Sequence, residues 1–79
     1  METVKFDYRR LRGRIREVFG TETKFAKKLG ISRTSMSQRM NNASEFSATE
    51  ILNASRLLEI PAADIPDYFF TEEVQKHEL

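Results

Sequence analysis

Two very short helices joined by a tight turn are the feature that most constrains this fold. Thr21 and Ser32 are residue types that cap helix N-termini, and Gly30 is the type that ends a helix in a left-handed conformation. We therefore expect helices over about 22–29 and 33–40, joined around Gly30. This spacing is typical of a helix-turn-helix, whose second helix enters the major groove of DNA with its N-terminus leading.

Apolar residues on both sides of this pair recur at helical spacing and predict further helices. Asp7 is a good N-cap for a first helix, and Ser47 with Glu50 forms the capping box of a helix that runs to about Glu59. The side chains expected to face the core are Tyr8, Leu11, Ile15, Val18, Phe19, Phe25, Ala26, Leu29, Met36, Met40, Ile51, Leu52, Ala54, Leu57 and Leu58.

The C-terminal part offers room for little more regular structure. Pro61 and Pro66 leave space for only a turn or so of helix between them. The predicted fold class is therefore all-α. The domain is expected to span 1–70, with the helix-turn-helix at about 22–40 and a C-terminal tail at 71–79 that is frayed or ordered by a partner.

The two ends of the domain carry a different pattern. Val4 and Phe6 in front, and Tyr68 and Phe70 behind, alternate with a period of two residues. Alternation of this kind indicates extended chain, so the ends are expected to form a small two-stranded ribbon.

Charge is divided unequally along the chain. Residues 1–40 hold eleven of the thirteen Lys and Arg residues against four acids, a net charge of +7, whereas residues 41–79 carry −6. A basic half favours contact with a polyanion such as DNA, with the acidic half turned away. A solvated, functionally neutral surface would also account for the split.

The outward positions of the second short helix are all hydrogen-bonding types. Arg can bind guanine and Gln can bind adenine, each with two hydrogen bonds, and Ser and Thr suit either base. The alternative is a helix face that simply meets water. The candidate base-contact residues are Arg33, Thr34, Ser37 and Gln38.

With Phe25-Ala26 followed by Leu29-Gly30-Ile31-Ser32, residues 7–66 resemble the small phage Cro and C-type repressor family. The resemblance implies a five-helix, lambda-repressor-like domain that binds operator DNA as a dimer. Residues 5–8, 11–15 and 68–71 are more closely similar to Cro-like regulators and modulators of repression from temperate phages of Gram-positive bacteria. By position, the resemblance implies base contacts from Arg33, Thr34, Ser37 and Gln38, and phosphate contacts from Thr23, Lys24, Ser35, Arg39, Asn41 and Asn42.

A second hypothesis keeps the fold but changes the partner. Glu22 stands where the family often has Gln reaching a phosphate, and a carboxylate there would repel DNA. The acidic second half and the aromatic residues Tyr68, Phe69 and Phe70 suit a protein partner instead. The chain would then be an antirepressor that binds a repressor and blocks or alters its DNA binding.

Other functional classes find little support. The chain has no cysteine, no glycine-rich phosphate loop and a single histidine, His77, near its end. We therefore expect no enzyme activity, metal, cofactor or small-molecule substrate. The start of the chain does not resemble a signal peptide and no apolar run is long enough to span a membrane, which predicts a location in the bacterial cytoplasm without membrane contact.

Overall fold

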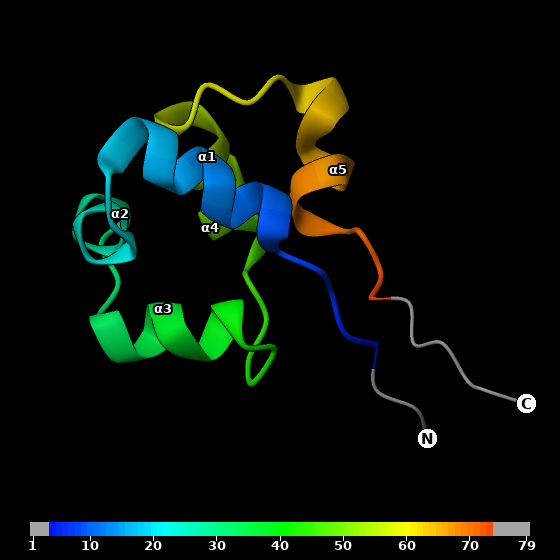
Figure 1. Cartoon of the computed structure of the whole chain (residues 1–79), viewed down its shortest axis with the longest axis horizontal. Helices are drawn as coiled ribbons and strands as arrows, with labels where there is room; N and C mark the ends of the chain where they lie inside the picture. The colour runs from blue at the N-terminus through cyan, green and yellow to red at the C-terminus, as the bar shows by residue number, and fades with distance from the viewer. Residues whose placement is uncertain (1–3, 74–79) are drawn as a thin grey trace, which may run out of the picture.

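A computed structural model describes residues 4–73 of the chain (Figure 1). The prediction of an all-α fold is confirmed, since five α-helices and one 3-10 turn account for the regular structure of this range. The elements are α1 (Arg9–Phe19), α2 (Glu22–Leu29), α3 (Arg33–Met40), α4 (Ala48–Leu57), η1 (Ala62–Asp64) and α5 (Ile65–Phe69).

The helices surround one small core. Helix α1 crosses the middle of the molecule, with α2 beside its C-terminal end, α3 below, α4 behind and α5 at the other side (Figure 1). Apolar side chains from every α-helix meet inside and are almost fully buried: Tyr8, Leu11, Ile15, Phe25, Ala26, Met36, Met40, Ala54, Leu58, Ile60 and Phe69. No helix within residues 4–73 has the length and apolar character required to cross a membrane.

The caps predicted for the three central helices are present. The side chains of Thr21, Ser32 and Ser47 accept hydrogen bonds from backbone amides in the first turns of α2, α3 and α4. Ser47 forms a full capping box, because the Glu50 carboxylate also accepts from the Ser47 amide at 3.0 Å. Gly30 ends α2 with φ of 85°, a conformation in which any residue with a Cβ would be strained.

Three boundaries differ from the prediction. Helix α1 begins at Arg9 with Tyr8 as N-cap, although the Asp7 carboxylate still accepts a hydrogen bond from the Arg9 amide at 2.9 Å. Helix α4 stops at Leu57, because Glu59 adopts a left-handed φ of 54° that ends the helix. Pro66 lies in the first turn of α5, where its missing amide hydrogen costs nothing, so the helix continues to Phe69.

Two side chains expected in the core lie at the surface. Val18 on α1 is 39% exposed and Leu52 on α4 is 52% exposed. Each sits at the edge of its helix's apolar stripe, and no neighbouring element covers it. The short α5 and the 3-10 turn leave the outer side of α4 open near Leu52.

The predicted ribbon shrinks to a single antiparallel bridge between Phe6 and Glu72. The Asp7 amide donates to the Thr71 carbonyl at 2.7 Å and the Glu73 amide to the Lys5 carbonyl at 2.8 Å. Tyr68 cannot join this pairing because it belongs to α5. Of the predicted tail, residues 71–73 lie along the N-terminal segment, and residues 74–79 lie outside the described range.

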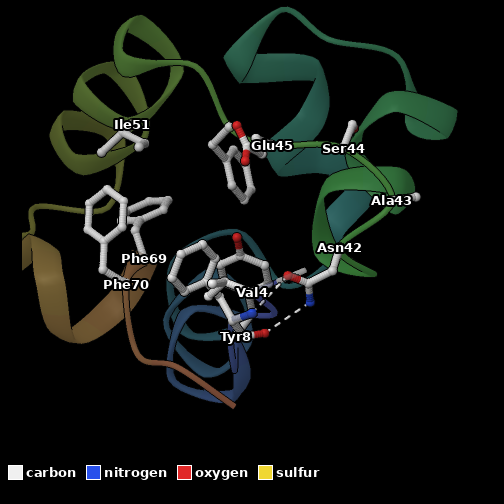
Figure 2. A pocket seen from close by; sticks show the side chains of 11 residues that line it. Val4, Tyr8, Asn42, Ala43, Ser44, Glu45, Ile51, Phe69 and Phe70 are labelled. Atoms are coloured by element: carbon white, nitrogen blue, oxygen red, sulfur yellow. Dashed lines mark hydrogen bonds between the residues drawn. The ribbon is translucent and has the colours of Figure 1, made fainter. Parts of the chain in front are cut away.

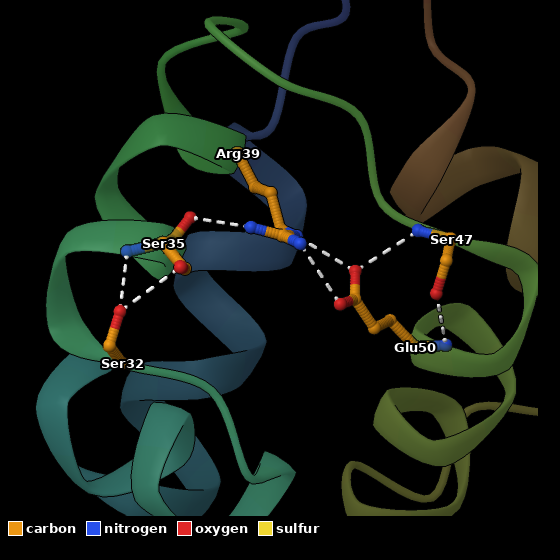
Figure 3. Close-up of polar contacts among 5 residues, drawn as sticks. All are labelled: Ser32, Ser35, Arg39, Ser47 and Glu50. Carbon is orange, nitrogen blue, oxygen red and sulfur yellow. Dashed lines mark hydrogen bonds and ion pairs between the residues drawn. The ribbon is translucent and has the colours of Figure 1, made fainter.

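One ion pair connects α3 to α4 (Figure 3). Arg39 donates to both carboxylate oxygens of Glu50, at 2.7 and 3.1 Å, and to the Ser35 carbonyl at 3.1 Å. Both side chains are mostly buried, with exposed fractions of 19% and 18%. Because Glu50 also caps α4, a single carboxylate holds the helix start and its neighbour together.

We expect the Glu50 carboxylate to stabilise the fold at neutral pH and to lose this effect in acid. Burial alone would raise its pKa, but hydrogen bonds from Arg39 and the Ser47 amide, with the Arg39 charge, lower the pKa below its ordinary value of 4.5. A carboxyl with a lowered pKa in the folded state stabilises the fold above its unfolded pKa and loses that effect as the pH falls through the folded value. We expect Glu50→Gln, which can still cap α4, to lose about 1–3 kcal/mol at neutral pH.

Urea unfolding of the wild type and Glu50→Gln between neutral and acid pH tests this. The difference between their free energies of unfolding should shrink as the pH falls below 4.5, since protonation removes the same charge that the substitution removes. A difference that stays constant with pH would contradict the assignment.

Candidate functional site

The exposed face of α3 is the first candidate surface. Arg33, Thr34, Ser37 and Gln38 are exposed on this helix and, at their spacing, lie on one side of it. Within residues 4–73, the side chains of Arg33, Thr34 and Gln38 form no hydrogen bond, whereas Ser37 accepts one from Asn41 at 3.3 Å. The face is polar and open to an incoming ligand.

The residues expected to contact phosphate divide into two groups. Thr23 and Lys24 are exposed at the start of α2. The other four side chains already have partners within the fold: Ser35 accepts from Ser32, Arg39 binds Glu50, Asn41 binds Ser37, and Asn42 binds Phe6. The structure therefore gives Arg39 and Asn42 positioning roles, and any phosphate contact from them would have to replace these bonds.

Glu22, the residue that argued against DNA, has a partner as well. Its carboxylate accepts a hydrogen bond from Arg12 at 2.7 Å, and Arg12 also donates to the Met40 carbonyl at 3.2 Å. Arg12 thus links α1 to the first residue of α2 and to the last residue of α3. The ion pair between Arg12 and Glu22 offsets the negative charge of Glu22, but the charge of Arg12 is then no longer free for a phosphate.

The second candidate surface is an aromatic pocket of about 360 Å³ (Figure 2). It lies where the N-terminal segment, the loop between α3 and α4, and the end of α5 meet. Ring contacts run edge to face around it, between Phe6 and Phe70 at 5.8 Å, Tyr8 and Phe46 at 5.6 Å, and Phe46 and Phe69 at 5.4 Å. We call this surface the aromatic pocket; it is lined by Val4, Phe6, Tyr8, Asn42, Ala43, Ser44, Glu45, Phe46, Ile51, Phe69 and Phe70.

Apolar side chains at the mouth of the aromatic pocket are open to solvent. Val4 is 56% exposed and Phe70 is 49% exposed. Glu45 lies at the rim and is exposed. Burial, and then the negative charge of Glu45, raises the pKa of the Tyr8 phenol, so this ring stays neutral at physiological pH. The pocket therefore combines neutral aromatic walls with an acidic edge.

Besides the bridge to residues 71–73, the side-chain amide of Asn42 holds the N-terminal segment beside this pocket. The Asn42 side chain accepts a hydrogen bond from the Phe6 amide at 2.8 Å and donates to the Phe6 carbonyl at 3.0 Å. Asn42 has a left-handed φ of 63°, which Asn tolerates better than most residues. The two bonds resemble those of a paired strand and fix the position of the Phe6 ring.

The sequence placed only part of this surface. Of the three aromatic residues expected at an interface, Phe70 lies at the mouth, whereas Phe69 is 2% exposed and belongs to the core. Tyr68 is half-buried and lies outside the pocket, with the Arg10 guanidinium 5.6 Å from the centre of its ring. Sequence reasoning missed Phe46 and assigned Phe6 to a ribbon, because their proximity depends on the bridge and the Asn42 bonds.

Neither surface has the residues of a metal centre. Within residues 4–73, no group of three or more His, Cys, Asp or Glu side chains is placed to hold a metal ion. The arrangement of aromatic and hydrogen-bonding groups is suited to binding macromolecules.

Comparison with known proteins identifies the family. The model of a family described as "Protein of unknown function (DUF739)" matches residues 4–72, and the chain belongs to this family. Its fold is similar to the solution structure of the modulator of repression (MOR) of the temperate bacteriophage TP901-1 from Lactococcus lactis, with a TM-score of 0.74 and 40% identity. The similarity covers 82% of this chain and 88% of that chain. No curated protein matches the chain. The chain is thus similar to a phage regulator.

The Asn42 bonds predict how firmly the pocket wall is held. Asn42→Gly keeps a residue that accepts the left-handed backbone but removes both bonds to Phe6. We expect this variant to remain folded and the Phe6 amide to exchange its hydrogen at least about tenfold faster, in line with the loss of about 1–2 kcal/mol of local stability. Amide exchange followed by NMR measures this, with the Leu11 amide as an internal reference. An unchanged Phe6 rate would show that the bridge to Glu72 alone fixes the segment.

Proposed function

We propose that this member of the family is a modulator of repression, which binds a phage repressor and alters the repressor's DNA binding. The aromatic pocket is the observation that carries the proposal. A 79-residue chain leaves Val4 and Phe70 largely exposed beside a hollow walled by further rings. Exposed aromatic groups around a pocket are typical of the energetic centre of a protein–protein interface.

The rim of the pocket indicates the chemistry of the partner. Glu45 borders the pocket, and the exposed Glu72 and Glu73 line the adjoining hollow on the other side of Phe6. Arg9 and Arg12 line the same hollow, but their charges are paired with Asp7 and Glu22. A surface with an apolar centre and an acidic edge fits a partner segment that carries an apolar anchor flanked by basic residues. The DNA-binding surface of a repressor is basic, so a modulator that covers it would prevent DNA from binding.

The protein of similar structure supports the same conclusion. It is named a modulator of repression, and its similarity covers most of both chains at 40% identity. Function depends on the site rather than on the fold alone, so the proposal rests on the pocket and its residues. It assigns no catalytic step to the chain.

Direct DNA binding by α3 is the second candidate function. The free side chains of Arg33, Thr34 and Gln38 favour it, as do the exposed lysines Lys24 and Lys27 on α2. Ser32 caps α3, and the backbone amides in the first turn of α3 point outward from the helix end, as they do at helix ends that bind phosphate. The two functions use different surfaces and are therefore separable by substitution.

Phe70 provides the test of the main proposal. We expect Phe70→Ala to weaken binding to a helix-turn-helix repressor encoded in the same genome by at least about tenfold, because an exposed aromatic anchor is lost. Isothermal titration calorimetry of the purified proteins measures this. Val18→Ala, which removes an exposed side chain on the far part of α1, is the matched control and should bind normally. Equal affinity of Phe70→Ala and the wild type would reject the pocket as the docking site.

Gln38 provides the test of the second candidate. Fluorescence anisotropy near physiological salt compares duplexes from the DNA flanking the gene with scrambled duplexes. A regulator that reads bases should prefer its operator by about a thousandfold or more, and Gln38→Ala should reduce this preference. A modulator that acts through a repressor should bind both duplexes weakly and equally, and Gln38→Ala should leave repressor binding unchanged.

A further inference from the structure

One hydroxyl in the aromatic pocket has no partner within the described fold. The Tyr8 side chain belongs to a residue that is only 6% exposed, yet its hydroxyl forms no hydrogen bond within residues 4–73. A buried tyrosine hydroxyl usually has a hydrogen-bond partner, because an unsatisfied one costs free energy. Ser44, which also lines the pocket, has a buried hydroxyl without a partner in the same range. The pocket therefore contains hydrogen-bonding groups that the described fold does not use.

A negative charge lies near the Tyr8 hydroxyl. In Figure 2 the Tyr8 oxygen points toward Glu45, which is the only charged residue among the described residues that line the pocket. Glu45 is exposed and forms no ion pair within residues 4–73. Its charge acts on the Tyr8 phenol, whose pKa is raised first by burial and then by Glu45. A neutral hydroxyl and a carboxylate are thus available to the same ligand.

The walls around these two groups suit an organic cation. The ring centres of Tyr8 and Phe46 lie 5.6 Å apart, and Phe70 stands at the mouth. A cation is attracted to the face of an aromatic ring, and more strongly where water is excluded. A guanidinium suits such a site better than an ammonium, because it is planar, weakly hydrated and able to donate hydrogen bonds to two acceptors at once.

We propose that the aromatic pocket binds one arginine side chain of the partner protein. The guanidinium donates hydrogen bonds to the Tyr8 oxygen and to the Glu45 carboxylate, and the apolar anchor of the same partner segment contacts Val4 and Phe70 at the mouth. The pocket volume of about 360 Å³ is room for a long side chain rather than for a helix about 10 Å wide. This inference rests on the proposed function, because it takes the occupant from a protein partner, and it identifies the basic residue that the pocket selects.

A titration with small probes tests the site without any repressor. The isotopically labelled full chain is titrated with N-acetyl-arginine methylamide and with the matching citrulline compound, which has nearly the same shape but no charge. We expect saturable NMR shifts at Tyr8, Glu45 and Phe70 with the arginine probe, and a dissociation constant at least about tenfold higher with the citrulline probe. Equal binding of the two probes, or the absence of a saturable shift at Tyr8, would overturn the proposal.

Two substitutions remove the proposed acceptors one at a time. Tyr8→Phe removes only the hydroxyl, and Glu45→Gln removes only the charge. Each should raise the dissociation constant of the arginine probe by at least about fivefold, because a charge-assisted hydrogen bond is lost. Glu17→Gln, which removes an exposed carboxylate on α1 outside the pocket, is the matched control and should bind the probe normally. Equal effects of Glu45→Gln and Glu17→Gln would indicate nonspecific attraction and would overturn the proposal.

The melting temperature of Tyr8→Phe separates binding from folding. Because the hydroxyl has no partner within residues 4–73, its removal should leave the melting temperature unchanged or raise it. A fall of several degrees would show that the hydroxyl already stabilises the fold, and would overturn its assignment as a free acceptor.

Calorimetric titration with the repressor connects the site to its partner. Tyr8→Phe and Glu45→Gln should each weaken repressor binding by at least about fivefold. If both bind the repressor like the wild type while Phe70→Ala binds it weakly, the proposed function stands and the arginine assignment fails. If the wild type binds no repressor but still binds the arginine probe at Tyr8, the proposed function fails and the arginine site stands.

Discussion

The two hydrogen bonds between Arg39 and Glu50 determine where α3 lies. This helix contributes only two fully buried apolar side chains, Met36 and Met40, to the core. Such a small apolar contribution allows a short helix to shift along its neighbours, because apolar contacts are not directional. The ion pair is directional, because the hydrogen bonds from Arg39 on α3 to Glu50 at the capped start of α4 allow only one placement of α3 against α4. The orientation of the exposed face of α3 depends on it.

A comparable arrangement builds the aromatic pocket from segments far apart in the sequence. The rings of Phe6, Phe46 and Phe70 come from the N-terminal segment, a loop and the end of α5. The bridge between Phe6 and Glu72 and the bonds from Asn42 bring these segments together. Asn42, for which the family resemblance implied a phosphate contact, thus positions Phe6 within the fold. The fold leaves part of the apolar surface of these rings exposed, and this surface is available for burial against a partner.

The sequence predicted the helices well because their signals are local. Caps such as Thr21, Ser32 and Ser47 act within a few residues, and the structure confirms all three. Predictions that depended on distant contacts were less complete. The prediction that Leu52 is buried was wrong, because no neighbouring segment covers that side of α4. The roles of Asn42 and Arg39 could not be derived from spacing, since their partners lie 36 and 11 residues away.

The arrangement of charge relates the two candidate surfaces to different partners. Basic residues on α2 and α3 remain exposed beside the α3 face, whereas the aromatic pocket has an acidic rim at Glu45. A DNA duplex would be repelled from the second surface and attracted to the first, and a basic protein surface would show the opposite preference. Charge alone does not decide between DNA and a protein, because the chain carries a surface suited to each. Exposed apolar area does decide for the aromatic pocket, since DNA phosphates gain nothing from exposed rings such as Phe70, whereas a protein partner buries them. This difference favours a protein partner at the aromatic pocket.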